Sequence, residues 1–206
     1  MTLANQLTLL RAVLALAMFA CILMHGFQPK VAALLLFAVA SFTDWLDGKI
    51  ARHTNTITPF GAIADPFVDK ILVGGAFVAF AVIRELNVPV WAVFLIIARE
   101  MMISSLRALA ALKGQVLSAD KSGKFKTGFQ MGCITVILLL LAAHSAPPNA
   151  SFHADAAALY HYFRKWPYYL TIAAMLITWT SGIMYIAKHW KLLSESWSAR
   201  KENGGK

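Results

Sequence analysis

Six apolar segments, each long enough to cross a lipid bilayer, limit most strongly what this chain can fold into. A helix that spans the hydrocarbon core needs about 20 mostly apolar residues, and a few charges near one end are tolerated. The composition agrees, since 59% of the residues are hydrophobic and 14% are charged. We therefore predict an all-α integral membrane protein, a bundle of six transmembrane helices. The segments are Leu9–Phe27, Val31–Ile50, Ala62–Ile83, Val88–Leu112, Lys124–His144 and Pro167–Lys188.

Two shorter amphipathic segments are expected to lie along the membrane surface. Leu3, Leu7 and Leu10 recur at helical spacing and predict an N-terminal interfacial helix that leads into the first span. The one long connection, 145–166, also carries apolar residues at helical spacing and predicts a second interfacial helix. The N-terminal segment has three polar residues that could line the edge of an active cavity: Asn5, Thr8 and Arg11.

The distribution of lysine and arginine predicts which side of the membrane each connection faces. The side that carries residues 44–69 and both termini holds most of the 19 basic residues. The other basic residues are Lys30, Arg84, Arg164 and Lys165 on the opposite side, and Arg99 inside a span. By the positive-inside rule, the first side faces the cytoplasm. We expect one membrane domain, 1–190, followed by a cytoplasmic polar tail, 191–206.

Four aspartates lie between the second and third apolar segments, namely Asp44, Asp47, Asp65 and Asp69. An aspartate at the centre of a membrane helix costs about 2.5–3.5 kcal/mol, so we expect these side chains to face a wet cavity and a cation. The first two are three residues apart and the last two are four apart, so each pair shares one helix face. Two antiparallel helices could present both pairs to a common point. Carboxylate oxygens favour a hard cation, and opposed pairs suit two Mg²⁺ or Mn²⁺ ions acting on a phosphate group.

Other residues of the same stretch fit the recognition of a phosphorylated nucleotide. Gly48 and Gly61 have no side chain where a nucleotide could approach the backbone, and Arg52 is suited to bind phosphate. Pro66 leaves two possibilities for the third helix. It could lie in the first turn with Asp65 as the N-cap, or it could lie within a helix that starts earlier and kink it.

A second charged group lies on the fourth and fifth segments and consists of Arg99, Arg107, Lys124 and Lys126. Arg99 and Arg107 are eight residues apart and lie on roughly the same helix face. Glu100 is next to Arg99, and neighbours on a helix are not expected to face each other. Arg107 and the two lysines could be positive-inside anchors, whereas Arg99 lies too deep for that role, so we favour a function for it.

The spacing Asp44-x-x-Asp47-Gly48-x-x-Ala51-Arg52-x8-Gly61-x-x-x-Asp65-x-x-x-Asp69 resembles the signature of the CDP-alcohol phosphotransferase family at every fixed position. The resemblance implies transfer of a substituted phosphate from a CDP-linked donor to an alcohol, with release of CMP. It also implies six transmembrane helices, a dinuclear Mg²⁺ or Mn²⁺ site and a homodimer. Carried over by position, the metal ligands are Asp44, Asp47, Asp65 and Asp69, and the CDP-binding residues are Gly48, Arg52 and Gly61. The resemblance also makes Asp69 the general base.

Three further segments resemble the members of this family that use CDP-diacylglycerol and sn-glycerol 3-phosphate. They are Asn5-x-Leu7-Thr8-x-x-Arg11, Ala98-Arg99-Glu100-x-x-Ile103-Ser104-x-x-Arg107 and Gly123-Lys124-x-Lys126-Thr127. The resemblance implies a multi-pass protein of the bacterial inner (cytoplasmic) membrane. Glycerol 3-phosphate is a dianion, so its site needs cations that are not already neutralised. We hypothesise that the acceptor phosphate is held by Arg99, Arg107, Lys124 and Lys126.

Other functions compete with this interpretation. A sister enzyme could use serine, phosphatidylglycerol or inositol phosphate as the acceptor. A prenyl-diphosphate transferase also uses aspartate-rich membrane motifs, but six spans are few for that fold. A cation transporter would need carboxylates through the membrane depth, whereas here they cluster at one rim. The formal charge of +9 is spread over turns between helices, so we expect membrane lipids and phosphorylated substrates as partners and no nucleic acid.

Overall fold

The computed structural model describes residues 3–54, 59–112, 121–149 and 152–190. Side chains are described over the same ranges except at 3–5, 45–54, 59–66, 112, 121, 122 and 124. Every regular element in the described part of the chain is a helix, as predicted. Its elements are α1 (Leu3–Leu23), α2 (Phe27–Thr54), α3 (Pro59–Val82), the 3-10 helix η1 (Arg84–Leu86), α4 (Val90–Leu112), α5 (Lys121–His144), α6 (His153–Phe163) and α7 (Trp166–Lys188).

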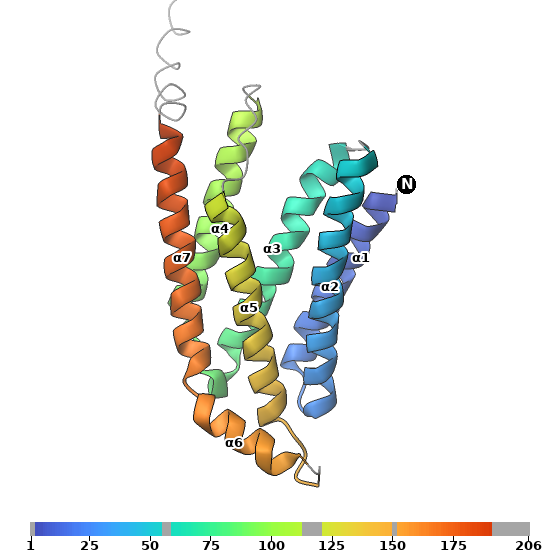
Figure 1. Ribbon diagram of the computed structural model, residues 1–206, viewed down its shortest axis with the longest axis vertical. Coiled ribbons are helices and arrows are strands. Elements are labelled where there is room, and N and C mark those ends of the chain that lie inside the picture. Colours follow the sequence, from blue (N-terminus) through green and yellow to red (C-terminus); the bar gives the residue numbers. More distant parts are fainter. Residues whose placement is uncertain (1–2, 55–58, 113–120, 150–151, 191–206) are drawn as a thin grey trace, which may run out of the picture.

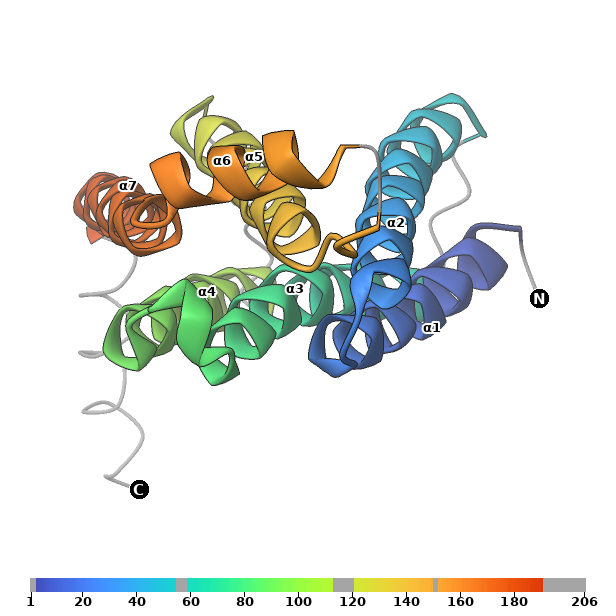
Figure 2. The same cartoon turned by 90° about the horizontal axis from the view of Figure 1, so that it is seen from below.

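The long helices run up and down beside one another, while α6 lies across one end of the bundle (Figure 1). We call the other end, where α2 ends and α3 begins, the motif end. The view along the bundle shows how the helices group around α3 and α5 (Figure 2). Helix α1 packs on α2 and α3, α4 packs on α3 and α7, and α5 contacts α2, α3, α6 and α7. The long helices of the described part therefore form an antiparallel bundle.

Three helices of the described part are long and apolar enough to cross a membrane. Their apolar stretches are Gln6–Leu23, Phe125–His144 and Trp166–Lys188. Large apolar side chains also lie exposed on the outer surface, among them Leu16 on α1 and Phe94 on α4. An apolar exterior of this kind is typical of a protein that is surrounded by lipid.

Two predictions about helix starts are decided by the structure. The N-terminal interfacial helix is not a separate element, because α1 runs without a break from Leu3 to Leu23. No glycine or proline interrupts that stretch, and its polar residues are compatible with a helix, so that prediction was wrong. Helix α3 begins at Pro59, so Pro66 lies within the helix and Asp65 is not its N-cap. The alternative of a helix that starts earlier is confirmed.

The helix predicted in the long connection is present as α6. It is held on the bundle by Tyr160, whose hydroxyl donates to the carbonyl oxygen of Glu85 at 3.1 Å. The same ring stacks on His144 of α5, with the ring centroids 4.1 Å apart. Burial raises the pKa of the Tyr160 phenol. These contacts explain why α6 lies across the end of the bundle and does not continue α5.

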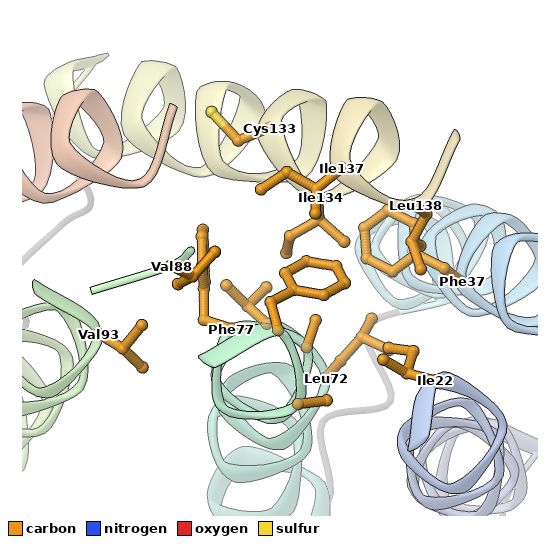
Figure 3. Packing of buried hydrophobic residues seen from close by; sticks show 14 of the residues in the cluster. Ile22, Phe37, Leu72, Phe77, Val88, Val93, Cys133, Ile134, Ile137 and Leu138 are labelled. Carbon is orange, nitrogen blue, oxygen red and sulfur yellow. The ribbon is translucent and has the colours of Figure 1, made fainter. Parts of the chain in front are cut away.

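The apolar core is built around α3, whose buried residues recur at helical spacing. Leu72, Ala76 and Phe80 are fully buried along this face, and Phe77 lies beside them. Figure 3 shows Phe77 among side chains that converge from α1, α2, α3 and α5. This core lies between α6 and the motif end, so it fixes the separation of the helices that carry the charged residues.

Substituting Phe77 with alanine should destabilise the fold strongly, because the lost ring leaves a cavity that the neighbouring helices cannot fill. We expect the free energy of unfolding to fall by about 3–5 kcal/mol. Thermal unfolding of the detergent-solubilised protein would measure the change. Phe94→Ala is the matched control, since that ring is 66% exposed. Equal losses in the two variants would contradict the placement of Phe77 at the centre of the core.

Candidate active site

The aspartate motif occupies the end of α2 and the start of α3, which both lie at the motif end (Figure 1). Of the four aspartates, Asp44 and Asp69 have described side chains. The remaining predicted motif residues fall in the same two helices, with side chains outside the described set: Asp47, Gly48, Arg52, Gly61 and Asp65. The structure therefore places the two halves of the motif on helices that reach the same end of the bundle, and the roles of these five residues stay predictions.

Arg11 of α1 is bound to the first aspartate of the motif. Its Nη1 atom lies 2.8 Å from Oδ1 of Asp44, and the arginine side chain is 2% exposed. Thr8, one turn earlier on α1, is also buried. Of the three residues proposed for the cavity edge, Thr8 and Arg11 thus lie inside the bundle, and the Asn5 side chain is not described. The ion pair compensates charge in the site, a role that the sequence interpretation did not anticipate.

Asp69 links the aspartate motif to the second charged group. Together with Lys126 and Glu100, it lines a pocket of about 190 Å³ between α3, α4 and α5. The polar residues of that pocket are Asp69, Lys70, Glu100, Lys126, Thr127 and Gln130, and the other lining residues are apolar except for Gly74. A pocket with one charged region and apolar walls suits an amphiphilic substrate.

Glu100 binds two of the cations proposed for the acceptor phosphate. It forms an ion pair with Lys126 of α5, and its Oε1 atom lies 3.4 Å from Nη1 of Arg99. The expectation that Arg99 and Glu100 do not face each other was wrong, because their long side chains bend toward the same point. The premise that the acceptor cations are free of partners was also wrong. One carboxylate between two buried cations still leaves excess positive charge.

The other members of the second charged group are placed differently. Arg107 lies on the exposed side of α4, with its guanidinium carbon 5.3 Å from the ring centroid of Tyr185 on α7. Lys124 falls at the start of α5, and its side chain is outside the described set. The structure therefore gathers Arg99, Lys126 and Glu100 closely, and gives Arg107 a partner on another helix.

Helix α7 supplies site residues that the sequence interpretation missed. The Oγ atom of Ser181 accepts a hydrogen bond of 3.2 Å from Nη2 of Arg99. One turn deeper, Gln130 of α5 donates to Thr178 across 2.9 Å in a buried contact. A signal was available, because the polar residues Thr171, Thr178 and Ser181 recur near helical spacing in an otherwise apolar segment.

The donor set of the motif fits a hard divalent cation. Among the described side chains, no group of three or more acidic, histidine or cysteine residues is close enough to hold a metal ion. Two of the four aspartates lie outside that set. The two that are described carry only carboxylate oxygens, and Asp44 is 44% exposed despite its ion pair with Arg11. Oxygen ligands with remaining solvent access match the coordination that Mg²⁺ and Mn²⁺ prefer.

Comparison with known proteins defines the class. Residues 1–194 match the model of the CDP-alcohol phosphatidyltransferase family. The chain belongs to this family, as its motif indicated, and it is a transferase enzyme.

Similar proteins include two bacterial enzymes and a plant enzyme. The chain is 35% identical to the CDP-diacylglycerol–glycerol-3-phosphate 3-phosphatidyltransferase of Bacillus subtilis (strain 168), over 81% of this chain and 77% of that protein. It is 34% identical to a probable phosphatidylglycerophosphate synthase of Mycobacterium tuberculosis, over 90% of this chain and 80% of the relative. A cardiolipin synthase (CMP-forming) of Oryza sativa subsp. japonica is 32% identical over 94% of this chain and 59% of the relative.

Glu100→Gln should destabilise the motif end, because Lys126 and Arg99 would lose the carboxylate that compensates their buried charge. We expect a loss of about 2–3 kcal/mol in the free energy of unfolding, or roughly 5–10 °C in melting temperature. Thermal unfolding in detergent would measure it. Glu85→Gln, at an exposed carboxylate near the opposite end, is the control. A melting temperature equal to that of the control would contradict the bridging role.

Proposed function

We propose that this enzyme transfers the phosphatidyl group of CDP-diacylglycerol to sn-glycerol 3-phosphate, which gives phosphatidylglycerophosphate and CMP. The observation that carries the proposal is the position of Asp69, which belongs to the motif and lines one pocket together with Lys126 and Glu100. A site for a CDP-linked donor and a cationic site for a phosphorylated acceptor would then meet at one carboxylate. The bacterial relatives whose names state this reaction support the choice of substrates.

We further propose that the protein crosses the bacterial cytoplasmic membrane six times and works as a homodimer. Three helices have the length and composition for a span, and α2, α3 and α4 are at least as long as α7. Among the residues that the structure describes, most of the basic ones belong to the motif end. By the positive-inside rule, the active site and both termini would face the cytoplasm.

Two divalent cations, Mg²⁺ or Mn²⁺, would be held by Asp44, Asp47, Asp65 and Asp69. Bound there, they would neutralise the diphosphate of the donor and stabilise the departing CMP. Arg11 holds Asp44 in a fixed orientation, which favours a preformed ligand set. The CDP moiety would be bound by Gly48, Arg52 and Gly61.

The acceptor phosphate would be bound by Arg99, Arg107, Lys124 and Lys126. Glu100 compensates part of this charge and keeps Arg99 and Lys126 stable inside the bundle before substrate arrives. A dianionic phosphate has more charge than this single carboxylate, so it can compete for the same donors. The acceptor hydroxyl would then be directed toward Asp69.

In the reaction, Asp69 would accept the proton of the acceptor hydroxyl. The hydroxyl oxygen attacks the β-phosphorus of CDP-diacylglycerol, which carries the diacylglycerol group. The bond from that phosphorus to the bridging oxygen breaks, and the bridging oxygen leaves as part of CMP. The apolar walls of the pocket between α3, α4 and α5 would exclude water, which would otherwise compete as the nucleophile.

The second candidate function is the same transfer to a different acceptor alcohol. The similarity to a plant cardiolipin synthase supports this candidate, so the assay compares several acceptors. The solubilised enzyme should release CMP from CDP-diacylglycerol with glycerol 3-phosphate, and much less with serine, phosphatidylglycerol or inositol phosphate. A chelator should abolish the release and Mg²⁺ or Mn²⁺ should restore it. Faster turnover with any other acceptor would overturn the proposed substrate. CMP release at the same rate with and without the chelator would overturn the metal site.

Asp69→Asn should lower kcat by about 10²–10⁴-fold, because an amide cannot accept the proton of the attacking hydroxyl. Binding of CDP-diacylglycerol should persist, since three aspartates remain. The measurement is CMP release, with binding of the donor followed separately. Asp155→Asn changes an exposed carboxylate on α6, far along the chain from the motif, and is the control. Near-normal turnover of the Asp69 variant would contradict its role as general base.

A further inference from the structure

The guanidinium group of Arg99 lies directly against the backbone of α7 at Gly182. A Cβ atom added to Gly182 would be 2.8 Å from Nε of Arg99, 3.2 Å from Cγ and 3.5 Å from Cδ. The first of these distances is too short for any real contact, so no residue with a side chain fits here while Arg99 keeps its position. Glycine is unfavourable inside a helix, and this close approach accounts for it at Gly182.

Ser181, next to this glycine, fixes the orientation of the same guanidinium. Its Oγ atom accepts the 3.2 Å hydrogen bond from Nη2 of Arg99, and both residues are buried. On the other side, Nη1 of Arg99 faces Glu100 at 3.4 Å. The arginine is therefore held between a carboxylate of its own helix and the hydroxyl and backbone of α7.

Tyr185, one turn further along α7, forms the equivalent contact with the second arginine. Its ring is buried, and the guanidinium carbon of Arg107 lies 5.3 Å above the ring centroid. This distance is within the range of a cation–π interaction. Gly182 and Tyr185 are three residues apart, so they share a face of α7 that is turned to α4. The same face thus contacts both arginines, which are eight residues apart on α4.

We propose that the segment Ser181–Tyr185 of α7 is a positioning element for the acceptor phosphate, and that Gly182 determines its geometry. The inference rests on the proposed function, in which Arg99 and Arg107 bind that phosphate. Helix α7 sets the direction of both guanidinium groups, although neither Ser181 nor Gly182 needs to touch the substrate. Two arginines bind one phosphate well only if both guanidinium planes face it. A wrong orientation of either guanidinium group therefore weakens phosphate binding.

The test is Gly182→Ala in the full-length, detergent-solubilised protein. The added methyl group collides with the flexible Arg99 side chain and not with backbone, so we expect Arg99 to move while the fold is kept. The KM for glycerol 3-phosphate should rise about tenfold, while the KM for CDP-diacylglycerol should stay within about twofold of wild type. A structural defect alone would impair both substrates together.

Gly132→Ala is the matched control. Gly132 lies on α5, and a Cβ atom added there meets nothing within 4 Å. Both substitutions add the same methyl group to a helix, so only the collision with Arg99 distinguishes them. The control should keep both KM values of the wild type.

Combining the substitution with Arg99→Ala shows whether Gly182 acts through Arg99. Arg99→Ala alone should raise the KM for glycerol 3-phosphate, and adding Gly182→Ala should then change nothing further. Ser181→Ala adds no atom and provides a second test, with a smaller increase in the same KM that Ser181→Thr should restore. The proposal is overturned if Gly182→Ala and Ser181→Ala both keep the wild-type KM for glycerol 3-phosphate. It is also overturned if Gly182→Ala raises this KM by the same factor in the Arg99→Ala background as in the wild type.

Failure of the proposed function gives a different result. A wild-type protein without transfer to glycerol 3-phosphate would overturn the proposed function and, with it, this inference. An unchanged KM in Arg99→Ala would overturn the acceptor site itself. The third outcome is an increased KM for glycerol 3-phosphate in Arg99→Ala together with wild-type KM values in the α7 variants. It would support the acceptor site and overturn only the positioning role of α7.

Discussion

Burial of positive charge inside an apolar bundle is the constraint on which the motif end depends. Arg11, Arg99 and Lys126 are all buried, and each is paired with a carboxylate of a neighbouring residue or helix. An unpaired charge in this environment would cost several kcal/mol, so these pairs determine how α1, α4 and α5 can approach the motif. In the proposed function, two of these cations, Arg99 and Lys126, bind the phosphate of the acceptor. Stability and substrate recognition would then depend on the same few contacts.

The fold could be predicted from the sequence to a large extent because lipid exposure imposes a simple rule. Long apolar segments became helices, and two consecutive pairs, α1 with α2 and α3 with α4, pack against each other. The rule did not determine how helices begin. The polar residues near Leu3 suggested a separate surface helix, but they are equally compatible with the first turns of a long one. Helix α3 begins at Pro59, a residue favoured at the first helical position, but Pro66 carries the same local signal, so the sequence could not choose between the two starts.

The candidate site could be predicted only where its residues are neighbours in the sequence. The aspartate spacing identified the family, which the family comparison confirms. The contacts of Glu100 with Lys126 and of Arg99 with Ser181 join residues 26 and 82 positions apart, and no local pattern specifies them. Glu100 was set aside because adjacent helical residues point apart, yet the length of both side chains lets them meet. Gly182 looked like any other glycine in an apolar segment, since its role depends on an arginine of another helix.

The layer of apolar side chains between α6 and the motif end limits the passage of ions through the bundle. Phe77, Phe80, Ile134 and Leu138 are fully buried there, and they come from two helices that cross the middle of the bundle. In a protein that crosses the membrane as proposed, a charged cavity that reached both faces would be a path for ions. The packed apolar layer opposes such a path without a moving gate.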